Sequence, residues 1–462
     1  MTFIARYTII IGMERKKQID ISLKVLTGAS LAVALMLTFT VSDYYIFNRI
    51  SEFGFFFCLS QWVKKAGLLL LPLAVYYGKK SCADIAKCVL PPFVILSCCI
   101  FGGFFDITKP ALTPQQEIYN LINLFIPKAA NITMFFLHNA LTLAVCALLF
   151  ARDYKIAPRS FLYLAPAMLL TVPLNIFENF FDISEIPQNS FLRFKNFSVW
   201  HFAALAALVG VTVGAYYFLR GKNEKNKDSF LGAIAIALLI QYHSKDSMLL
   251  GDGYNVYDTI TAVVPLFICN IGVYIASVSV FAKNKILYAI SFFVHAAGAV
   301  SVFVYFGRDD MSNFGIFCSY SFLYFCITHV GLFVLSVMPT ALGRYKFKYR
   351  DCLIPLGYYF GVIIIAAVSS ALVTSAAETW HTPSGVYLDT PVLPNYAFTQ
   401  LNPFPFTVPP VWTITVWNYD LNCIYLLGLY AVYVAIFFAF NGFYYAFLAV
   451  RKKILAKKTA QI

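Results

Sequence analysis

The chain has 462 residues, of which 60% are hydrophobic and only 12% are charged, and its mean hydropathy is +0.72. A soluble domain usually carries about twice that share of charged residues, so the composition excludes a large soluble catalytic domain. The net charge of +13 does not indicate nucleic-acid binding, because the basic residues lie in short clusters between apolar runs, where they orient a membrane protein. We therefore expect membrane lipids as partners and no nucleic acid.

Apolar segments long enough to span a bilayer follow one another along the whole chain. They cover residues 26–48, 58–77, 85–105, 131–151, 160–180, 198–219, 230–249, 259–282, 285–306, 315–339, 352–374 and 422–447. A polar stretch at 220–228 divides them into two sets of equal number. The sequence thus predicts an all-α polytopic membrane protein of about twelve transmembrane helices. Its two six-helix halves are expected at 1–225 and 226–462.

The positions of Lys and Arg give the expected orientation. Basic residues collect at the N-terminus, in every second loop and at the C-terminus, and the alternate loops contain few of them. Basic loops stay in the cytoplasm under the positive-inside rule. Both termini and the 220–228 linker are therefore predicted to be cytoplasmic.

The two halves show a short internal similarity. An ungapped alignment pairs residues that are 191 positions apart, namely His138 with His329, Tyr154-Lys155 with Tyr345-Lys346, Arg159 with Arg350, and Leu162 with Leu353. Because each half has an even number of spans, both would enter the membrane in the same direction. We interpret the halves as a diverged parallel duplication.

A cysteine and a histidine at similar depth are the first candidates for chemistry. Cys269 and His329 lie in two spans that both start outside, and at 1.5 Å per residue their depths differ by about 6 Å. An imidazole that takes the proton of a thiol generates a thiolate that attacks an ester carbonyl. Pro265 removes a helix hydrogen bond next to Cys269. His295, near the middle of the following span, is a rival base by the same argument.

Each of these residues also has a purely structural interpretation. A cysteine in an apolar helix is more often a small packing residue, and a buried histidine more often bonds to a nearby hydroxyl or carbonyl. The 11 cysteines include no CxxC pair, and no phosphate loop or HExxH motif is present. No metal or cofactor is predicted. The 375–421 loop lacks Lys and Arg and is rich in proline and aromatics, so we expect it to pack at the outer interface.

Three short motifs in the second half carry a family resemblance. They are PLFICNI at 265–271, HVG at 329–331 and NYAF at 395–398. Over about 226–450 the chain resembles the YwaF-like bacterial integral membrane proteins, whose eukaryotic relatives are acyltransferases acting on glycerophospholipids. The family is also distantly similar to the androgen-induced membrane hydrolases of fatty-acid esters.

The resemblance implies a bacterial plasma-membrane protein in which Cys269 carries the acyl group and His329 is its base. It makes Asn270, His295, Asn395 and Tyr396 the candidate substrate-binding residues. Two positions depart from the family pattern. Phe267 stands where the family has a histidine, and Asn270 stands where it has an acidic residue, so a nearby base and an orienting carboxylate are both missing.

Two other classes of function remain open from the sequence. The duplicated architecture suits a carrier whose two halves rock against each other. A non-enzymatic membrane scaffold is the third interpretation. The ungapped offset of 191 pairs Cys269 with Gly78, a little beyond Lys64 and Lys65, so no cysteine stands at the matching position of the first half. We therefore expect the first half to be non-catalytic.

Overall fold

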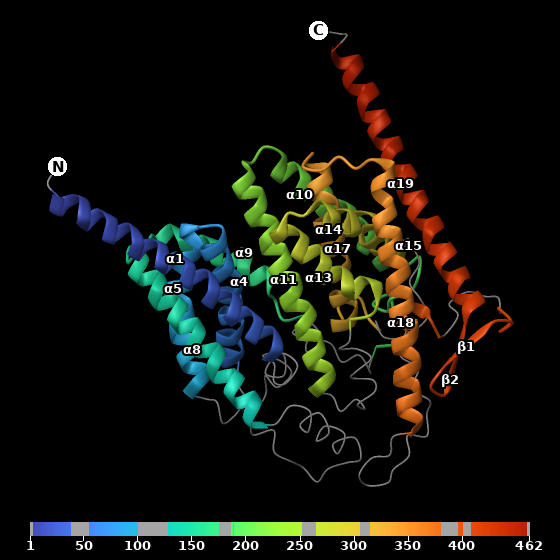
Figure 1. The fold of residues 1–462 in the computed structure, drawn as a ribbon, viewed down its shortest axis with the longest axis horizontal. Helices are drawn as coiled ribbons and strands as arrows, with labels where there is room; N and C mark the ends of the chain where they lie inside the picture. Colours follow the sequence, from blue (N-terminus) through green and yellow to red (C-terminus); the bar gives the residue numbers. More distant parts are fainter. Residues whose placement is uncertain are drawn as a thin grey trace. The chain divides into compact units, whose positions relative to one another are not determined.

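The computed structural model of the chain is mostly helical (Figure 1). It describes residues 3–37, 55–99, 128–174, 186–187, 189–251, 265–304, 315–379, 396–400 and 408–459. Within these residues, eight helices are long and apolar enough to cross a membrane: Cys58–Tyr76, Lys80–Cys99, Thr133–Arg152, Val199–Arg220, Lys285–Val304, Tyr320–Ala341, Arg350–Ser375 and Cys423–Ala446. Ile268–Ala282 is a shorter apolar helix. The multi-pass character predicted from composition is thus supported by the length of the helices.

Eight predicted spans coincide with these eight helices. The other four, at 26–48, 160–180, 230–249 and 259–282, each include residues whose backbone or side chains lie outside the described part of the chain. The count of twelve and the two six-helix halves therefore stay predictions.

The helices group into two compact units. The first comprises Met1–Phe194, Lys222–Thr259 and Asn313–Phe325, and the second comprises Lys195–Gly221, Ile260–Ser312 and Cys326–Ile462. Consequently α10 (Val199–Arg220) groups with the second unit and α11 (Glu224–Gly251) with the first. These units are groups of packed helices, and the predicted boundary between two repeats at residue 225 stays a prediction.

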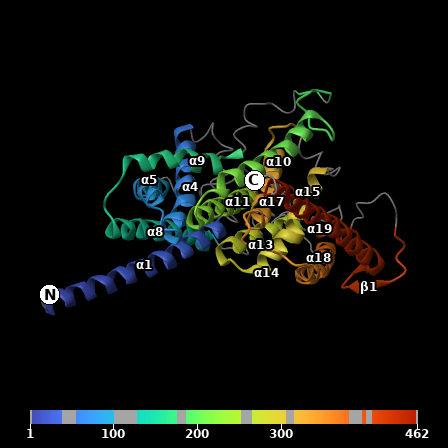
Figure 2. The same ribbon diagram turned by 90° about the horizontal axis from the view of Figure 1, so that it is seen from above.

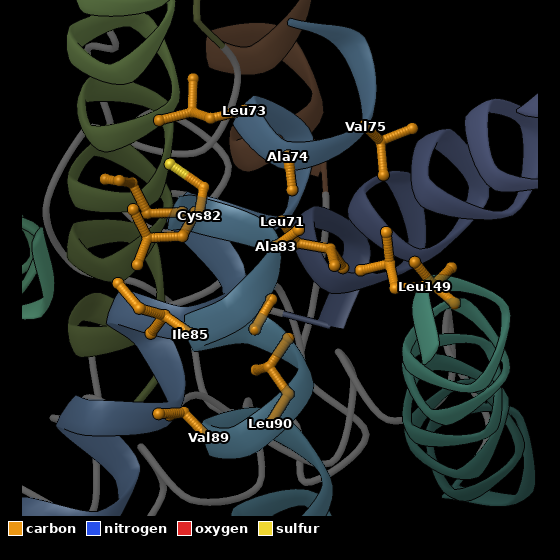
Figure 3. Close-up of a cluster of buried hydrophobic side chains, with 14 of the residues drawn as sticks. Leu71, Leu73, Ala74, Val75, Cys82, Ala83, Ile85, Val89, Leu90 and Leu149 are labelled. Carbon is orange, nitrogen blue, oxygen red and sulfur yellow. The ribbon is translucent and has the colours of Figure 1, made fainter. Parts of the chain in front are cut away.

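The first unit is a bundle of apolar helices. It contains α1 (Phe3–Leu37), α4 (Phe55–Tyr76), α5 (Lys80–Cys99), α8 (Lys128–Arg152), the 3₁₀ turn η1 (Pro158–Tyr163), α9 (Leu164–Leu170) and α11. Helix α4 packs on α5, and α8 packs on α1 and α5. Side chains of α4, α5 and α8 meet in the core that Figure 3 shows, including Leu71, Val75, Ile85, Leu90 and Leu149.

A glycine allows the close approach of α4 and α5. A Cβ at Gly67 would lie 2.7 Å from Cδ2 of Leu90, closer than real Cβ contacts allow. Leu90 is itself completely buried, so it has little room to move. The two helices pack as they do because this position has no side chain.

A buried ion pair fastens the turn after α8 to α5. The Lys87 ammonium lies 3.1 Å from Oδ1 of Asp84, and the two side chains are 1% and 0% exposed. Oδ2 of Asp84 accepts hydrogen bonds from the Ala157 N–H (3.1 Å) and the Ser160 hydroxyl (2.9 Å). Lys87 also donates to the backbone carbonyls of residues 153 (2.7 Å) and 155 (3.1 Å). Both buried charges are thereby compensated by close polar partners.

The second unit holds the region of the family motifs. It contains α10, α13 (Ile268–Ala282), α14 (Lys285–Ile290), a π-helical turn η5 (Ser291–His295), α15 (Ala296–Val304), α17 (Tyr320–Ala341), η6 (Tyr349–Cys352), α18 (Leu353–Thr379), η7 (Tyr396–Phe398), β1 (Thr413–Val416), β2 (Tyr419–Asn422) and α19 (Cys423–Thr459). The elements α14, η5 and α15 form one continuous span. Helices α13, α14 and α18 lie close together in Figure 2, and α14 contacts both of the others.

Helix α13 has well-defined ends. Phe267 is its N-cap, with an extended backbone, and Lys283 ends it in the left-handed conformation with φ of 51°. The next helix starts at once, because the Asn284 side chain accepts hydrogen bonds from the N–H groups of residues 286 and 287. The fixed connection sets α13 beside the span that carries His295.

Part of the predicted outer segment has structure of its own. Strands β1 and β2 form an antiparallel hairpin in which Ile414 pairs with Leu421 and Val416 with Tyr419. Leu421 packs on Ala367 and Ala371 of α18. The hairpin thus packs against a helix, and Cys423 follows it directly as the first residue of α19. Its place at the outer interface stays a prediction.

Candidate functional site

Cys269 lies in the first turn of α13. Its side chain is half-buried. The preceding residues close this end of the helix, because the Phe267 ring packs against Tyr396 at 5.6 Å between centroids with the planes at 70°. Tyr396 is completely buried, and its N–H donates to the Ser370 hydroxyl of α18 at 3.1 Å. The structure therefore brings the predicted residue Tyr396 next to the turn that carries Cys269.

His295 packs on the same helix. Its side chain is completely buried, and it is the last residue of the π-helical turn η5. A Cβ at Gly272 would lie 2.7 Å from Nδ1 of this ring, so the imidazole fills the space that a side chain at Gly272 would need. Gly272 is three residues after Cys269 and hence on a neighbouring part of the same helix face. The backbone of Ile268 also interacts with the ring.

The two nitrogens of His295 have different surroundings. Nε2 lies 3.2 Å from the hydroxyl of Tyr358 on α18. Nδ1 makes no hydrogen bond of standard geometry with the described residues. A buried polar atom in this state needs an explanation, of which a catalytic role is one. The π-helical turn is a second such feature, because π-turns inside α-helices concentrate at functional sites.

Tyrosines of α18 and α19 complete the surroundings of Cys269. Tyr359 stacks on Tyr430 at 5.9 Å and contacts Tyr433 edge to face at 5.2 Å. The Cys269 thiol lies within electrostatic range of the Tyr359 and Tyr433 hydroxyls. Cys269 and His295 therefore face consecutive tyrosines, 359 and 358, of one helix.

His329 has a different set of described contacts. It is buried in α17, and its ring meets the Phe303 ring edge to face at 6.3 Å. The Phe303 carbonyl in turn accepts a hydrogen bond from Nε2 of His201 at 3.0 Å. His329 lies about one turn before Leu332, which contacts the Gly272 position. The Cys269–His329 pair stays a prediction.

Two asparagines, Asn270 and Asn395, were also predicted to lie at the site. Asn270 is half-buried beside Cys269 on α13. Asn395 lies outside the described residues. Among the described residues, no cluster of three or more His, Cys, Asp or Glu side chains is arranged to hold a metal ion.

Sequence reasoning missed Gly272, Tyr358 and the other tyrosines around Cys269. A signal for Gly272 was present, since a glycine three residues after a candidate nucleophile leaves room for a neighbouring ring. The contribution of Tyr358 had no local signal, because it is 63 positions from His295 and the two meet only when α18 packs against η5.

The comparisons with known proteins concern the same half of the chain. The model of the TMEM164 family, a membrane protein family, matches residues 196–440. This range includes α10, α13, η5, α17 and α18 together with the candidate site. No curated protein and no solved structure matches the chain. The family match covers more than half of the sequence, and the chain therefore belongs to the TMEM164 family.

Proposed function

We propose that the second unit is a lipid-directed acyltransferase or acyl hydrolase in which Cys269 is the nucleophile. One observation carries the proposal: a half-buried thiol lies in the first turn of a helix, and a buried imidazole packs on the same helix at Gly272, three residues further along. A thiolate at this position is stabilised by the positive end of the helix dipole and by the N–H groups of the first turn. Among the described residues the arrangement suits nucleophilic catalysis without a metal ligand set.

The surroundings favour a lipid substrate. The helices of the second unit expose large apolar side chains, among them Val211 and Tyr217 on α10 and Ile365 on α18. An acyl chain would lie along such surfaces without loss of hydrophobic contact. Asn270 and Tyr396, with Asn395, would contact the polar part of the lipid. Its ester carbonyl would then stand near the boundary between the apolar helices and the outer segment.

The relationship to the YwaF-like proteins and to acyltransferases is part of this proposal. Phe267 stands where the family pattern has a histidine. Its ring packs on Tyr396, so this residue has a structural role in place of a chemical one. The base that the family pattern would supply two residues before the cysteine must therefore come from another element. The resemblance assigns that role to His329.

We also propose the predicted topology of about twelve spans with both termini in the cytoplasm of a plasma membrane. The structure adds support for the duplication. The 3₁₀ turn η1 starts at Pro158 and η6 starts at Tyr349, and both follow a long span. The difference, 349 − 158 = 191, is the offset that aligns His138 with His329.

The test is the acyl composition of lipids extracted from cells that express each variant at matched protein level. Cys269→Ser should give the profile of an empty vector, because a serine hydroxyl is activated far more poorly than a thiol by an imidazole. The matched control is Cys326→Ser, a half-buried cysteine in α17 of the same unit, which should resemble the wild type. Identical profiles for wild type, Cys269→Ser and the empty vector would contradict acyl transfer and favour a carrier or a scaffold.

A further inference from the structure

Two histidines compete for the role of base in the second unit, and their contacts differ. The ring of His295 packs at Gly272 and the backbone of Ile268, on the turn that carries Cys269. The described ring contact of His329 is with Phe303 of α15. The packing thus sets His295 against the nucleophile's own helix.

Resting on the proposed function, we propose that His295 is the base that takes the proton of Cys269, and that Tyr358 is the positioning residue that holds its ring. The inference stands on three observations: the contact of the ring with α13, the complete burial of the side chain, and the hydrogen bond between Nε2 and Tyr358. The second nitrogen, Nδ1, is the one on the α13 side.

The hydrogen bond with Tyr358 is compatible with the tautomer that the proposal requires. A neutral imidazole has one N–H donor and one acceptor nitrogen. When Nε2–H donates to the Tyr358 oxygen at 3.2 Å, Nδ1 has a free lone pair on the side of α13. Once Nδ1 is protonated, the Ile268 carbonyl beside the ring is available to accept its hydrogen bond. The same two contacts therefore serve both protonation states.

The chemical step balances with these groups alone. The Cys269 proton passes to Nδ1 of His295, the thiolate bonds to the ester carbonyl carbon, and the bond from that carbon to the lipid oxygen breaks. The departing alkoxide takes the proton from the imidazolium. Water or a second lipid hydroxyl then gives its proton to His295 and attacks the thioester, and the bond from the acyl carbon to sulfur breaks. The Cys269 thiolate takes the proton back from the imidazolium, which restores the thiol and the neutral imidazole. Water makes the reaction hydrolysis, and a lipid hydroxyl makes it acyl transfer.

Few other titratable groups surround this pair. Helix α18 contributes Tyr358 and Tyr359, α19 contributes Tyr430 and Tyr433, η7 contributes Tyr396, and α17 carries His329 about one turn from Leu332. The segments 268–282, 286–304, 320–341, 353–377 and 423–450 contain no Asp, Glu, Lys or Arg. The thiol and the imidazoles are therefore the groups of this cluster that can exchange a proton in the proposed step.

The test is the pH profile of alkylation of Cys269 by a maleimide with a dodecyl chain, measured by mass spectrometry on the full chain in membranes. His295→Gln should slow alkylation about tenfold near neutral pH and leave the rate above about pH 10 unchanged, because hydroxide then forms the thiolate. Tyr358→Phe should slow it roughly threefold in the same pH range, since it removes one neutral hydrogen bond. A loss of folding would instead change alkylation at every pH.

The control is His138→Gln, a buried histidine of the first unit, which should keep the wild-type profile. The inference is overturned if His329→Gln changes the profile and His295→Gln does not, or if neither histidine changes it.

The lipid assay separates this inference from the proposed function. If acyl exchange depends on Cys269 but the alkylation rate of Cys269 is unchanged in His295→Gln, only the proposed role of His295 is contradicted. If the alkylation rate depends on His295 but no acyl exchange is detected, the acyl-transfer function is contradicted and the pairing of Cys269 with His295 is retained.

Discussion

The first unit buries a charged pair, whereas the second buries a histidine that packs on the helix that carries Cys269. Lys87 has three close acceptors for its three protons, namely Asp84 and the backbone carbonyls of residues 153 and 155. His295 contacts the Tyr358 hydroxyl through Nε2, and its Nδ1 lies on the side of Gly272. Two opposite charges compensate each other within the first unit, whereas an imidazole can take and give a proton without a charged partner. The comparison therefore contrasts a structural ion pair with a candidate catalytic group.

The largest expected effect comes from breaking the buried pair. Asp84→Ala leaves the Lys87 ammonium buried without its carboxylate, and should lower the free energy of unfolding by about 3–5 kcal/mol. Thermal unfolding of the purified chain in detergent measures it.

The matched control is Asp20→Ala, which removes a partly exposed pair with Arg152 at 3.5 Å and should cost about 0–1 kcal/mol. If the Asp84 variant is not produced, the double variant Asp84→Ala with Lys87→Met should recover stability, because it also removes the unpaired charge. Equal costs at Asp84 and Asp20 would refute the fastening role.

The next effect tests the packing of His295 on α13. In Gly272→Ala the new methyl carbon would lie 2.7 Å from Nδ1 and 2.9 Å from Cγ of the ring. Because the ring is completely buried, the strain should lower the free energy of unfolding by about 1–3 kcal/mol. The control is Gly361→Ala on α18, where nothing lies within 4 Å and alanine should be neutral or stabilising. A neutral Gly272→Ala would mean that the ring lies elsewhere.

A smaller effect compares two neighbouring hydroxyls. Tyr358→Phe removes the hydrogen bond to His295 and should lower the free energy of unfolding by about 0.5–1.5 kcal/mol. Tyr359→Phe should cost less or be stabilising, because the Tyr359 hydroxyl is buried without a hydrogen bond to a described residue. Chemical denaturation of both variants, with each compared with the wild type, decides the order. The reverse order would contradict the contact between α18 and η5.

The smallest effect concerns an exposed carboxylate at the end of α8. Hydrogen bonds from the Lys80 ammonium and the N–H of Lys155 hold the pKa of Asp153 below its ordinary value of 3.8. A lowered pKa in the folded state stabilises the protein above pH 3.8, and this contribution is lost as the pH falls through the folded-state pKa. Asp153→Asn should therefore make the unfolding temperature slightly less sensitive to acid between about pH 5 and 3. An unchanged acid response would show that the ion pair is negligible.

The sequence predicts the long helices well and the site only in part. Spans such as 58–77 and 198–219 are visible because their apolar runs are as long as a bilayer is thick. Cys269 and His295 were candidates because polar or reactive groups in apolar segments are functional candidates, and Tyr396 was a candidate through the family resemblance.

Their arrangement was not predictable from the sequence. The ring contact of His295 depends on the π-helical turn η5 and on Gly272. A hydropathy profile predicts neither of these features. Helical periodicity gives the faces of one helix and does not say which faces of distant helices meet. For the same reason Lys87, which lies inside a predicted span, gave no indication that Asp84 and two carbonyls would surround it.

The central claim is that Cys269 carries an acyl group, and its most direct test is to look for that group. The purified chain is incubated with phospholipid, and the peptide containing Cys269 is analysed by mass spectrometry before and after hydroxylamine treatment, which cleaves thioesters. We expect an acyl adduct on Cys269 that hydroxylamine removes, and its absence in Cys269→Ser. An unmodified Cys269 in a chain that exchanges lipid acyl groups, or an adduct that persists in Cys269→Ser, would contradict the account.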